Sequence, residues 1–192
     1  HDLVHGPLEA LITADEETCM YGVNHLAADT LHGDILLNLD NETMGEFVIG
    51  SAGGVNISAT MQYKEVAPEA GDIAVKVCLQ GLKGGHSGLE INEGRANANK
   101  LMARFVRQAI ADDDARLCSW NGGNMRNAIP RTASAVLTIP AENLDDLKDL
   151  VAYCLETFKN EYAGIENEME MTIESTIMPA AQVPMEIQDN LV

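Results

Sequence analysis

Two stretches of this chain repeat apolar side chains at the spacing of an amphipathic helix, so each must cover one face of another element. They lie within residues 93–111 and 143–162. The apolar positions are Ala98, Leu101, Met102, Phe105, Val106, Ala109 and Ile110 in the first, and Leu144, Leu147, Leu150, Val151, Cys154, Leu155 and Phe158 in the second. Asn143 stands at the N-cap position of the second helix, with acidic side chains in the following turn, where the helix dipole favours them.

The segments around these helices have the shorter repeat that is typical of β-strands. We expect strands at about 55–63, 72–82, 116–120, 132–139 and 168–176. The resulting order is β-β-α-β-β-α-β. It predicts an α+β fold in which two helices cover one face of a largely antiparallel sheet.

The first fifty residues have a different pattern of apolar segments. A strand, a helix and a second strand are expected, in that order, at residues 7–13, 22–31 and 34–38. Such a βαβ unit predicts an α/β domain with a parallel sheet. The Ser51-Ala-Gly-Gly54 run then breaks the pattern. We therefore predict two domains, residues 1–53 and residues 54–192.

Three carboxylates follow the two N-terminal strands. Glu16 and Glu17 come after the first strand, and Asp40 after the second. Ligands of open α/β sheets bind beyond the carboxyl ends of the strands, so we expect all three side chains on one rim, as a candidate cation site. Of two adjacent carboxylates, one can ligate a metal while the other takes a proton from water. The alternative is a solvated acidic face, in a segment without Lys or Arg before residue 64.

Two turns rich in glycine carry further polar side chains. In the first, Gly81–Gly88, glycines surround His86, which could donate a hydrogen bond to an oxyanion or a carboxylate. In the second, Gly122–Arg131, Asn127 offers a donor and an acceptor. Arg126 or Arg131 could bind a carboxylate through two hydrogen bonds. The alternative is that both segments are ordinary turns without a ligand.

Together these segments resemble the aminoacyl-histidine dipeptidases (Xaa-His dipeptidases), a bacterial branch of the di-zinc exopeptidases that includes carnosinases and aminoacylases. The matching segments are His5–Glu9, Thr13–Met20, Asp34–Asp40, Ser51–Gly54, Gly81–Gly88, Gly94–Lys100 and Gly122–Arg131. The most diagnostic part is the Gly-His-Ser-Gly turn followed by Asn-Ala-Asn-Lys.

The resemblance implies metal-dependent hydrolysis of Xaa-His dipeptides. Glu16 matches the general base, Glu17 a ligand of one zinc ion, and Asp40 a ligand of the other. Manganese or cobalt are alternatives, because carboxylate-rich sites accept them. The family's His-x-Asp motif, bridging Asp and downstream His ligand have no counterpart in the 192 residues. The chain is therefore expected to be an internal fragment, metal-free and inactive by itself, of a full-length dipeptidase.

The resemblance also implies that residues 54–192 are a lid and dimerisation domain, incomplete at its C-terminal end. His86 matches a lid histidine that holds the substrate, across a homodimer in many relatives. Asn127 matches a substrate-contacting lid asparagine, and Arg131 is a weaker match. Residues 1–53 would be the end of the first segment of the catalytic domain. The alternative is a non-catalytic α/β module for dimerisation or ligand binding.

Composition narrows the choice of partners and compartment. Thirty acidic residues against twelve basic ones give a net charge of -18, which argues against binding to a nucleic acid. No apolar run approaches the roughly 18–20 residues that span a bilayer. The four cysteines form no C-x-x-C pair, and Cys78 and Cys154 are expected to be buried free thiols. We therefore predict a reduced, cytoplasmic protein with neither a nucleic acid nor a membrane as partner. The resemblance adds a dipeptide as the expected substrate.

Overall fold

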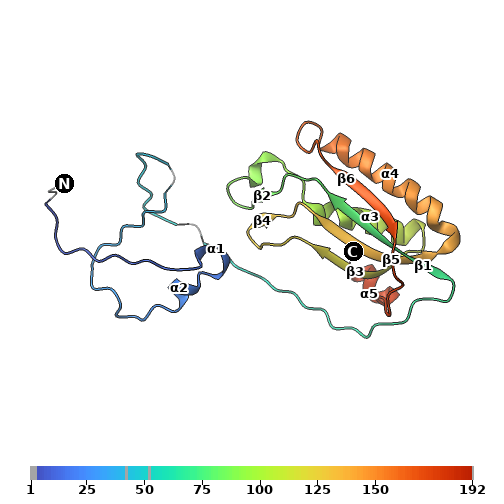
Figure 1. Cartoon of the computed structure of the whole chain (residues 1–192), viewed down its shortest axis with the longest axis horizontal. Coiled ribbons are helices and arrows are strands. Elements are labelled where there is room, and N and C mark those ends of the chain that lie inside the picture. The colour runs from blue at the N-terminus through green and yellow to red at the C-terminus, as the bar shows by residue number, and fades with distance from the viewer. Residues whose placement is uncertain (1–3, 42, 52, 192) are drawn as a thin grey trace. The chain divides into compact units, whose positions relative to one another are not determined.

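The computed structural model of the chain describes residues 4–41, 43–51 and 53–191. They gather into two units, His1–Ser58 and Ala59–Val192, which Figure 1 shows. Ala52, inside the predicted break, lies outside the described residues. None of the described helices combines the length and the apolar character that a bilayer crossing requires.

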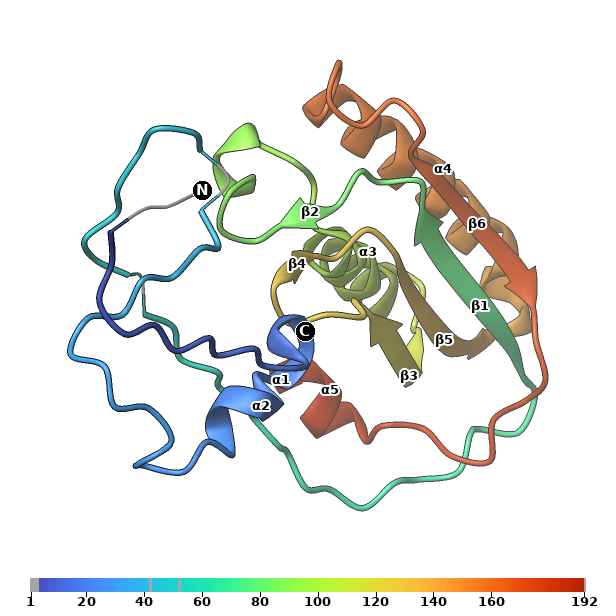
Figure 2. The same ribbon diagram turned by 60° about the vertical axis from the view of Figure 1, so that its left-hand side comes forward.

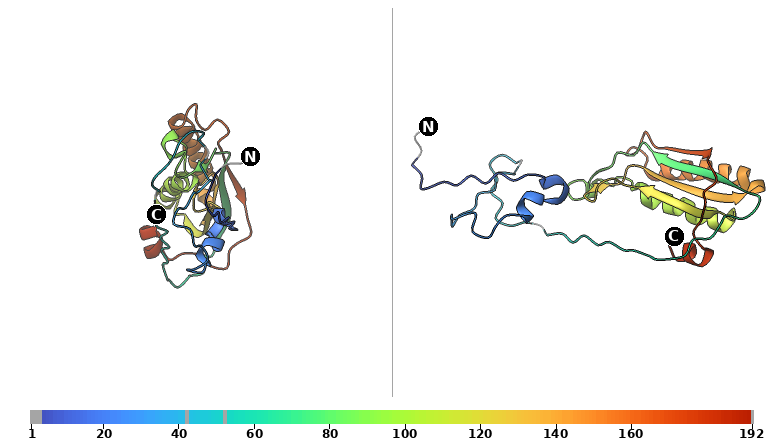
Figure 3. Two further views of the ribbon diagram at one scale, coloured as in Figure 1. Left: turned by 90° about the vertical axis from the view of Figure 1, so that its left-hand side faces the viewer. Right: turned by 60° about the horizontal axis from the view of Figure 1, so that its bottom comes forward.

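The second unit is built on a four-stranded antiparallel sheet. The strands, in their order across the sheet, are β3 (Arg116–Gly122), β5 (Ala133–Pro140), β1 (Asp72–Gln80) and β6 (Glu170–Ser175). All three neighbouring pairs are antiparallel, with Val77 opposite Ala135 on one side and Ile173 on the other. The helices α3 (Ala98–Asp112) and α4 (Leu144–Glu161) pack along this sheet (Figure 2, Figure 3).

The core lies between the sheet and the two helices. Alternate side chains of the central strands are buried against it, namely Val75, Val77, Leu79, Ala133, Ala135, Leu137 and Ile139. They contact the apolar stripes of the helices, in which Phe105 and Phe158 are fully buried. Each such aromatic side chain contributes about 1.5–3 kcal/mol by leaving water. The predicted antiparallel sheet with both helices on one face is therefore confirmed.

Helix α3 begins later than its periodicity suggests, for a local reason, whereas α4 begins directly after its predicted N-cap. Before α3, a 3-10 turn, η1 (Ile91–Glu93), ends at Gly94, whose φ of 70° is incompatible with a right-handed helix. Asn97 then caps α3 by accepting a hydrogen bond from the Lys100 N–H at 3.2 Å. Asn143 stands at the N-cap of α4 but makes no side-chain cap bond there. Its amide instead donates to the Asp113 carbonyl at 3.0 Å, which ties the two helices together.

The C-terminal segment covers the free edge of β3. Val183 N–H donates to the Leu117 carbonyl at 2.8 Å, and the side chain of Gln188, on α5 (Met185–Leu191), accepts from the Leu117 N–H at 2.7 Å. Gln182 accepts from the Thr138 hydroxyl at 2.6 Å and forms a backbone bridge to Val66. Backbone groups that an edge strand would otherwise leave unpaired are thus satisfied.

The first unit corrects the predicted parallel sheet. Its described residues contain two single-turn helices, α1 (Glu16–Cys19) and α2 (Tyr21–Asn24), and no strand. The expected strands at 7–13 and 34–38 are irregular, as is the expected strand at 55–63 in the connection to the second unit. The reason is that strand backbone needs a hydrogen-bonded neighbour, and none of these segments pairs with a strand among the described residues. Ile35, for example, is 81% exposed.

The cysteines that were expected to be buried thiols are both free. Cys154 is buried in the helical layer, where burial raises the pKa of its thiol. Cys78 is only half-buried on β1. The prediction is therefore confirmed for Cys154 and only partly for Cys78.

A buried carboxyl ends helix α3. Asp113 is 5% exposed, and its Oδ2 has no hydrogen-bond partner among the described residues. Burial raises the pKa of this carboxyl, and the nearby carboxylates of Asp112, Asp146 and Asp114 raise it further. A carboxylate at a helix C-terminus also opposes the helix dipole. The charged form of Asp113 therefore weakens the folded state.

We predict that Asp113→Asn stabilises the chain by about 1 kcal/mol at pH 7. Because the folded-state pKa is raised, the contribution of Asp113 is most favourable at low pH and is lost as pH rises through that folded pKa. The stabilising effect of Asn should therefore shrink below the unfolded pKa of about 4. Urea unfolding at several pH values measures this, with the exposed Asp112→Asn as a matched control. An equal effect of the two substitutions would contradict the assignment.

Candidate functional site

Two turns that are far apart in the sequence lie side by side at one end of the sheet. The first follows β1 and contains β2 (Gly85–His86), and the second precedes β5 and contains β4 (Ala128–Ile129). The two short strands pair antiparallel, with His86 opposite Ala128 (Figure 2). The Ser87 N–H also donates to the Asn127 carbonyl at 2.9 Å. His86 and Asn127 therefore belong to one surface.

The hydrogen bonds of the His86 ring select one tautomer of the neutral imidazole. Its Nδ1 accepts hydrogen bonds from the Gly88 N–H at 3.0 Å and the Leu89 N–H at 3.1 Å. Both donors are backbone amides, so Nδ1 must carry a lone pair and the neutral ring must carry its hydrogen on Nε2. His86 is exposed, and it can therefore offer one N–H donor to a ligand.

A carboxylate and a guanidinium hold the backbone of this turn. Glu90 accepts from the His86 N–H at 2.7 Å and forms an ion pair with Arg95. Arg95 also donates to the Gly84 carbonyl at 2.7 Å and pairs with Glu93. The His86 N–H bond is the largest cause that lowers the pKa of the Glu90 carboxyl, and Arg95 adds to it. Arg95 falls within the helix expected at residues 93–111, but it lies before α3, and its side chain reaches the backbone of the turn.

A second carboxylate, that of Glu166, holds the backbone next to the His86 turn. Glu166 is 3% exposed and follows α4. Its two oxygens accept from the Lys83 N–H at 2.8 Å and from the Ala96 N–H at 2.9 Å. It therefore joins the His86 turn to the chain that enters α3. No sequence motif indicates this role, because the two contacts span 83 and 70 residues.

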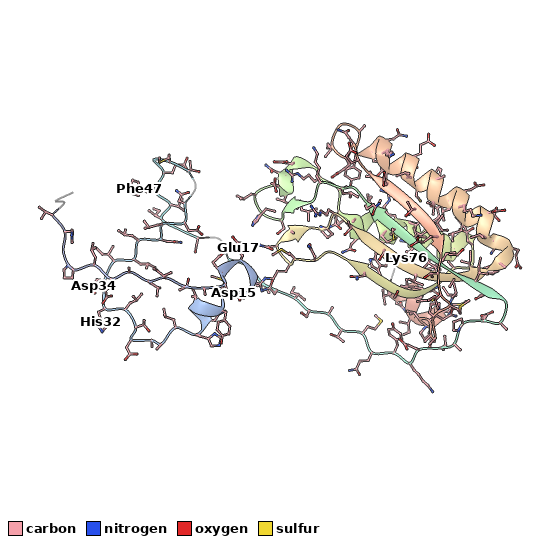
Figure 4. The ribbon with its side chains drawn as sticks, viewed as in Figure 1. Asp15, Glu17, His32, Asp34, Phe47 and Lys76 are labelled. Carbon is pink, nitrogen blue, oxygen red and sulfur yellow. The ribbon has the colours of Figure 1, made fainter. Side chains whose placement is uncertain are left out.

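Arg131 lies beside the same turn, at the border of two shallow cavities. Its side chain approaches Gly84, and it lines a cavity of about 460 Å³ together with Glu168 and Glu170. The neighbouring cavity, of about 380 Å³, also includes Arg131 and Lys76, which is labelled on β1 in Figure 4. Arg131 has no ion pair with any described carboxylate. It is therefore available to an anionic ligand.

The three N-terminal carboxylates lie elsewhere, in the first unit. Glu16 and Glu17 open helix α1 rather than ending a strand, and Figure 4 labels Glu17 there. Asp40 lies in irregular chain, with its N–H bonded to Asn38 at 3.2 Å. All three side chains are exposed. The predicted common rim does not form in the part of the chain that the structure describes.

The described residues do not by themselves fit a zinc ion. Protein zinc sites need three or four side-chain ligands. Among the described residues, no three His, Cys, Asp or Glu side chains are grouped closely enough to hold a metal ion. Two exposed carboxylates can supply only part of such a set.

Comparisons with known proteins find similarity to peptidases. A family model described as a peptidase dimerisation domain matches residues 77–166. The chain is 41% identical over 191 residues to the cytosol non-specific dipeptidase of Escherichia coli, and spans 39% of that protein's length. It is 37% identical to the crystal structure of aminoacylhistidine dipeptidase from Vibrio alginolyticus. That match covers 93% of this chain and 36% of the other, with a TM-score of 0.70.

We predict that Glu166→Ala destabilises the chain by about 3 kcal/mol, because it leaves two backbone N–H groups without their charged acceptor. Urea unfolding gives the free energy. The matched control is Glu168→Ala, which removes an exposed carboxylate two residues away. Losses of the same size in both variants would show that Glu166 is no more than a surface charge.

Proposed function

We propose that the chain is part of a metal-dependent dipeptidase, because it is similar over 100% of its length to a cytosol non-specific dipeptidase and over 93% of its length to an aminoacylhistidine dipeptidase. The observation that carries the proposal is the 41% identity over 191 residues. The match of residues 77–166 to a family model described as a peptidase dimerisation domain supports the same proposal. The chain spans 39% of the relative's length, so catalysis is proposed for a protein of that full length.

In this proposal the substrate is a dipeptide with a C-terminal histidine. The support is the similarity to the aminoacylhistidine dipeptidase of Vibrio alginolyticus. The E. coli relative is named as a non-specific dipeptidase, so the alternative is a broad specificity for dipeptides. A preference for histidine is the narrower of these two specificities. The cytosol in that relative's name supports a cytoplasmic location.

Glu16, Glu17 and Asp40 would divide the chemistry of hydrolysis. Glu16 would act as general base by taking a proton from the attacking water. Glu17 and Asp40 would each ligate one of two zinc ions, with the missing ligands supplied by other parts of the longer protein. Bound zinc supplies Lewis-acid chemistry at a scissile carbonyl. The exposure of the three carboxylates supports this division, because none is committed to an ion pair within the described chain.

The exposed apolar segments of the first unit support a larger catalytic domain. Leu36 and Leu37 are 77% and 76% exposed, and Phe47 is 96% exposed. We propose that residues 1–53 complete a sheet with strands from the remaining length of the protein. This chain alone would then be inactive and free of metal.

The lid, residues 54–192, would hold the substrate. His86 has one N–H donor to offer, Asn127 has an amide, and Arg131 has a guanidinium without an acidic partner among the described residues. These groups suit a carboxylate or a developing oxyanion. The pairing of the two turns supports their joint use.

We predict that Glu16→Gln, in a protein of the relatives' full length, lowers kcat for a Xaa-His dipeptide by at least about 100-fold. Two metal ions per chain should remain, because Glu16 is not a proposed ligand. Elemental mass spectrometry and a hydrolysis assay measure the two quantities. Asp40→Ala is the contrasting variant, which should lose metal and activity together. Wild-type protein with neither metal nor hydrolysis would overturn the proposed function.

A homodimer formed through the lid is the second proposal, and the match to a peptidase dimerisation domain favours it. We predict that this 192-residue chain sediments as a dimer at micromolar concentration. Sedimentation velocity over a range of concentrations measures this. A monomer at every concentration would contradict dimerisation by the lid alone.

A further inference from the structure

The His86 turn is closed by reciprocal bonds between two residues. The Glu90 carboxylate accepts from the His86 N–H at 2.7 Å, while the His86 carbonyl accepts from the Glu90 N–H at 3.2 Å. Inside this loop, the imidazole caps the Gly88 and Leu89 N–H groups. The arrangement is similar to a helix capping box, with an imidazole nitrogen in place of the usual hydroxyl. Ring orientation and backbone conformation are therefore coupled.

Arg95 locks the closed turn from outside. Its guanidinium joins Glu90 to the Gly84 carbonyl, so both ends of the turn share one cation. The Arg95 side chain is only 17% exposed and the Glu90 side chain 33% exposed. Partial burial reduces the screening that makes exposed ion pairs weak. These contacts restrain the loop more strongly than two surface charges would.

Two glycines lie close to the His86 ring and to the Glu90–Arg95 ion pair. Gly85 has a φ of 134°, and a Cβ there would collide with the Arg95 guanidinium and the Glu90 carboxylate. A Cβ on Gly88 would lie 3.2 Å from the His86 ring atoms Cε1 and Nδ1. The glycines of the Gly-His-Ser-Gly sequence therefore leave room for the Glu90–Arg95 ion pair as well as for the His86 ring.

We propose that Glu90 and Arg95 are positioning residues for His86, which hold its ring with Nδ1 capped and Nε2–H as the free donor. The inference rests on the proposed function only in assigning a substrate to that donor. A rotating ring would offer either nitrogen, as donor or as acceptor. A ring held in this way presents one donor in one direction, which suits an anionic group of the substrate.

The first test needs no activity and uses this chain. NMR of 15N-histidine-labelled protein reads the tautomer of His86, with His86→Gln to assign its signals. Amide exchange reports the capping bonds of Gly88 and Leu89. We expect only the Nε2–H neutral tautomer in the wild type. Glu90→Ala should reveal the Nδ1–H tautomer and speed both exchange rates about tenfold, as one lost hydrogen bond predicts.

Two further variants separate positioning from general loosening. Glu90→Gln keeps an acceptor for the His86 N–H, so it should restore most of the protection. Glu93→Ala removes the other carboxylate on Arg95 without a contact to His86, so exchange should stay within about twofold of wild type. Unchanged tautomer and exchange in folded Glu90→Ala would overturn the proposal. Equal loss in Glu93→Ala would overturn it as well.

The second test uses a protein of the relatives' full length. Glu90→Ala should raise KM for the dipeptide about tenfold with a smaller effect on kcat, as His86→Ala should. The double variant should be no worse than His86→Ala, because Glu90 acts through His86. A further loss in the double variant would overturn the proposal. If the wild type hydrolyses no dipeptide, the proposed function fails, and the NMR result still decides the positioning role.

Discussion

The apolar contact between the sheet and helices α3 and α4 is the interaction on which the rest of the second unit depends. It buries alternate residues of β1 and β5 and thereby fixes them as antiparallel neighbours, with Leu79 opposite Ala133. The end of β1 and the start of β5 consequently lie at the same end of the sheet. The turns that follow β1 and precede β5 must therefore meet there, which brings His86 beside Asn127. The candidate substrate surface is thus a consequence of the core.

The parts of the structure that follow from local repeats were predictable, and those that need distant partners were not. Helices α3 and α4 could be predicted from their own sequences, because apolar residues at 3.6-residue spacing can be recognised within a few turns. Residues 34–38 are just as apolar, but a strand forms only beside another strand. The pairing of β2 with β4 and the contacts of Glu166 likewise join residues far apart in sequence. The glycine-rich motif around His86 could be recognised in the sequence, whereas the contacts of Glu90 and Arg95 with this turn could not.

Charge is distributed unevenly between the two units. The chain has no Lys or Arg before residue 64, and the ion pairs that involve arginine lie in the second unit. Among the described residues of the first unit, Glu9 has the imidazole of His32 as a partner, at 3.0 Å. Carboxylates without basic neighbours repel one another, and bound cations relieve that repulsion. The charge pattern and the exposed apolar segments therefore agree with the proposal that ligands and strands from a longer protein complete the first unit.

Two carboxyl groups buried to a similar extent illustrate how this fold treats charge. Glu166 is satisfied on both oxygens by backbone N–H groups and supports the His86 turn. Asp113 has an unpartnered oxygen and three acidic neighbours at the end of a helix. Desolvation costs each group free energy, but only Glu166 recovers it through charge-assisted hydrogen bonds. Burial alone therefore says little about what a carboxylate contributes. The partners of Glu166 lie beside the candidate site, so the same bonds that offset its burial also hold that site in place.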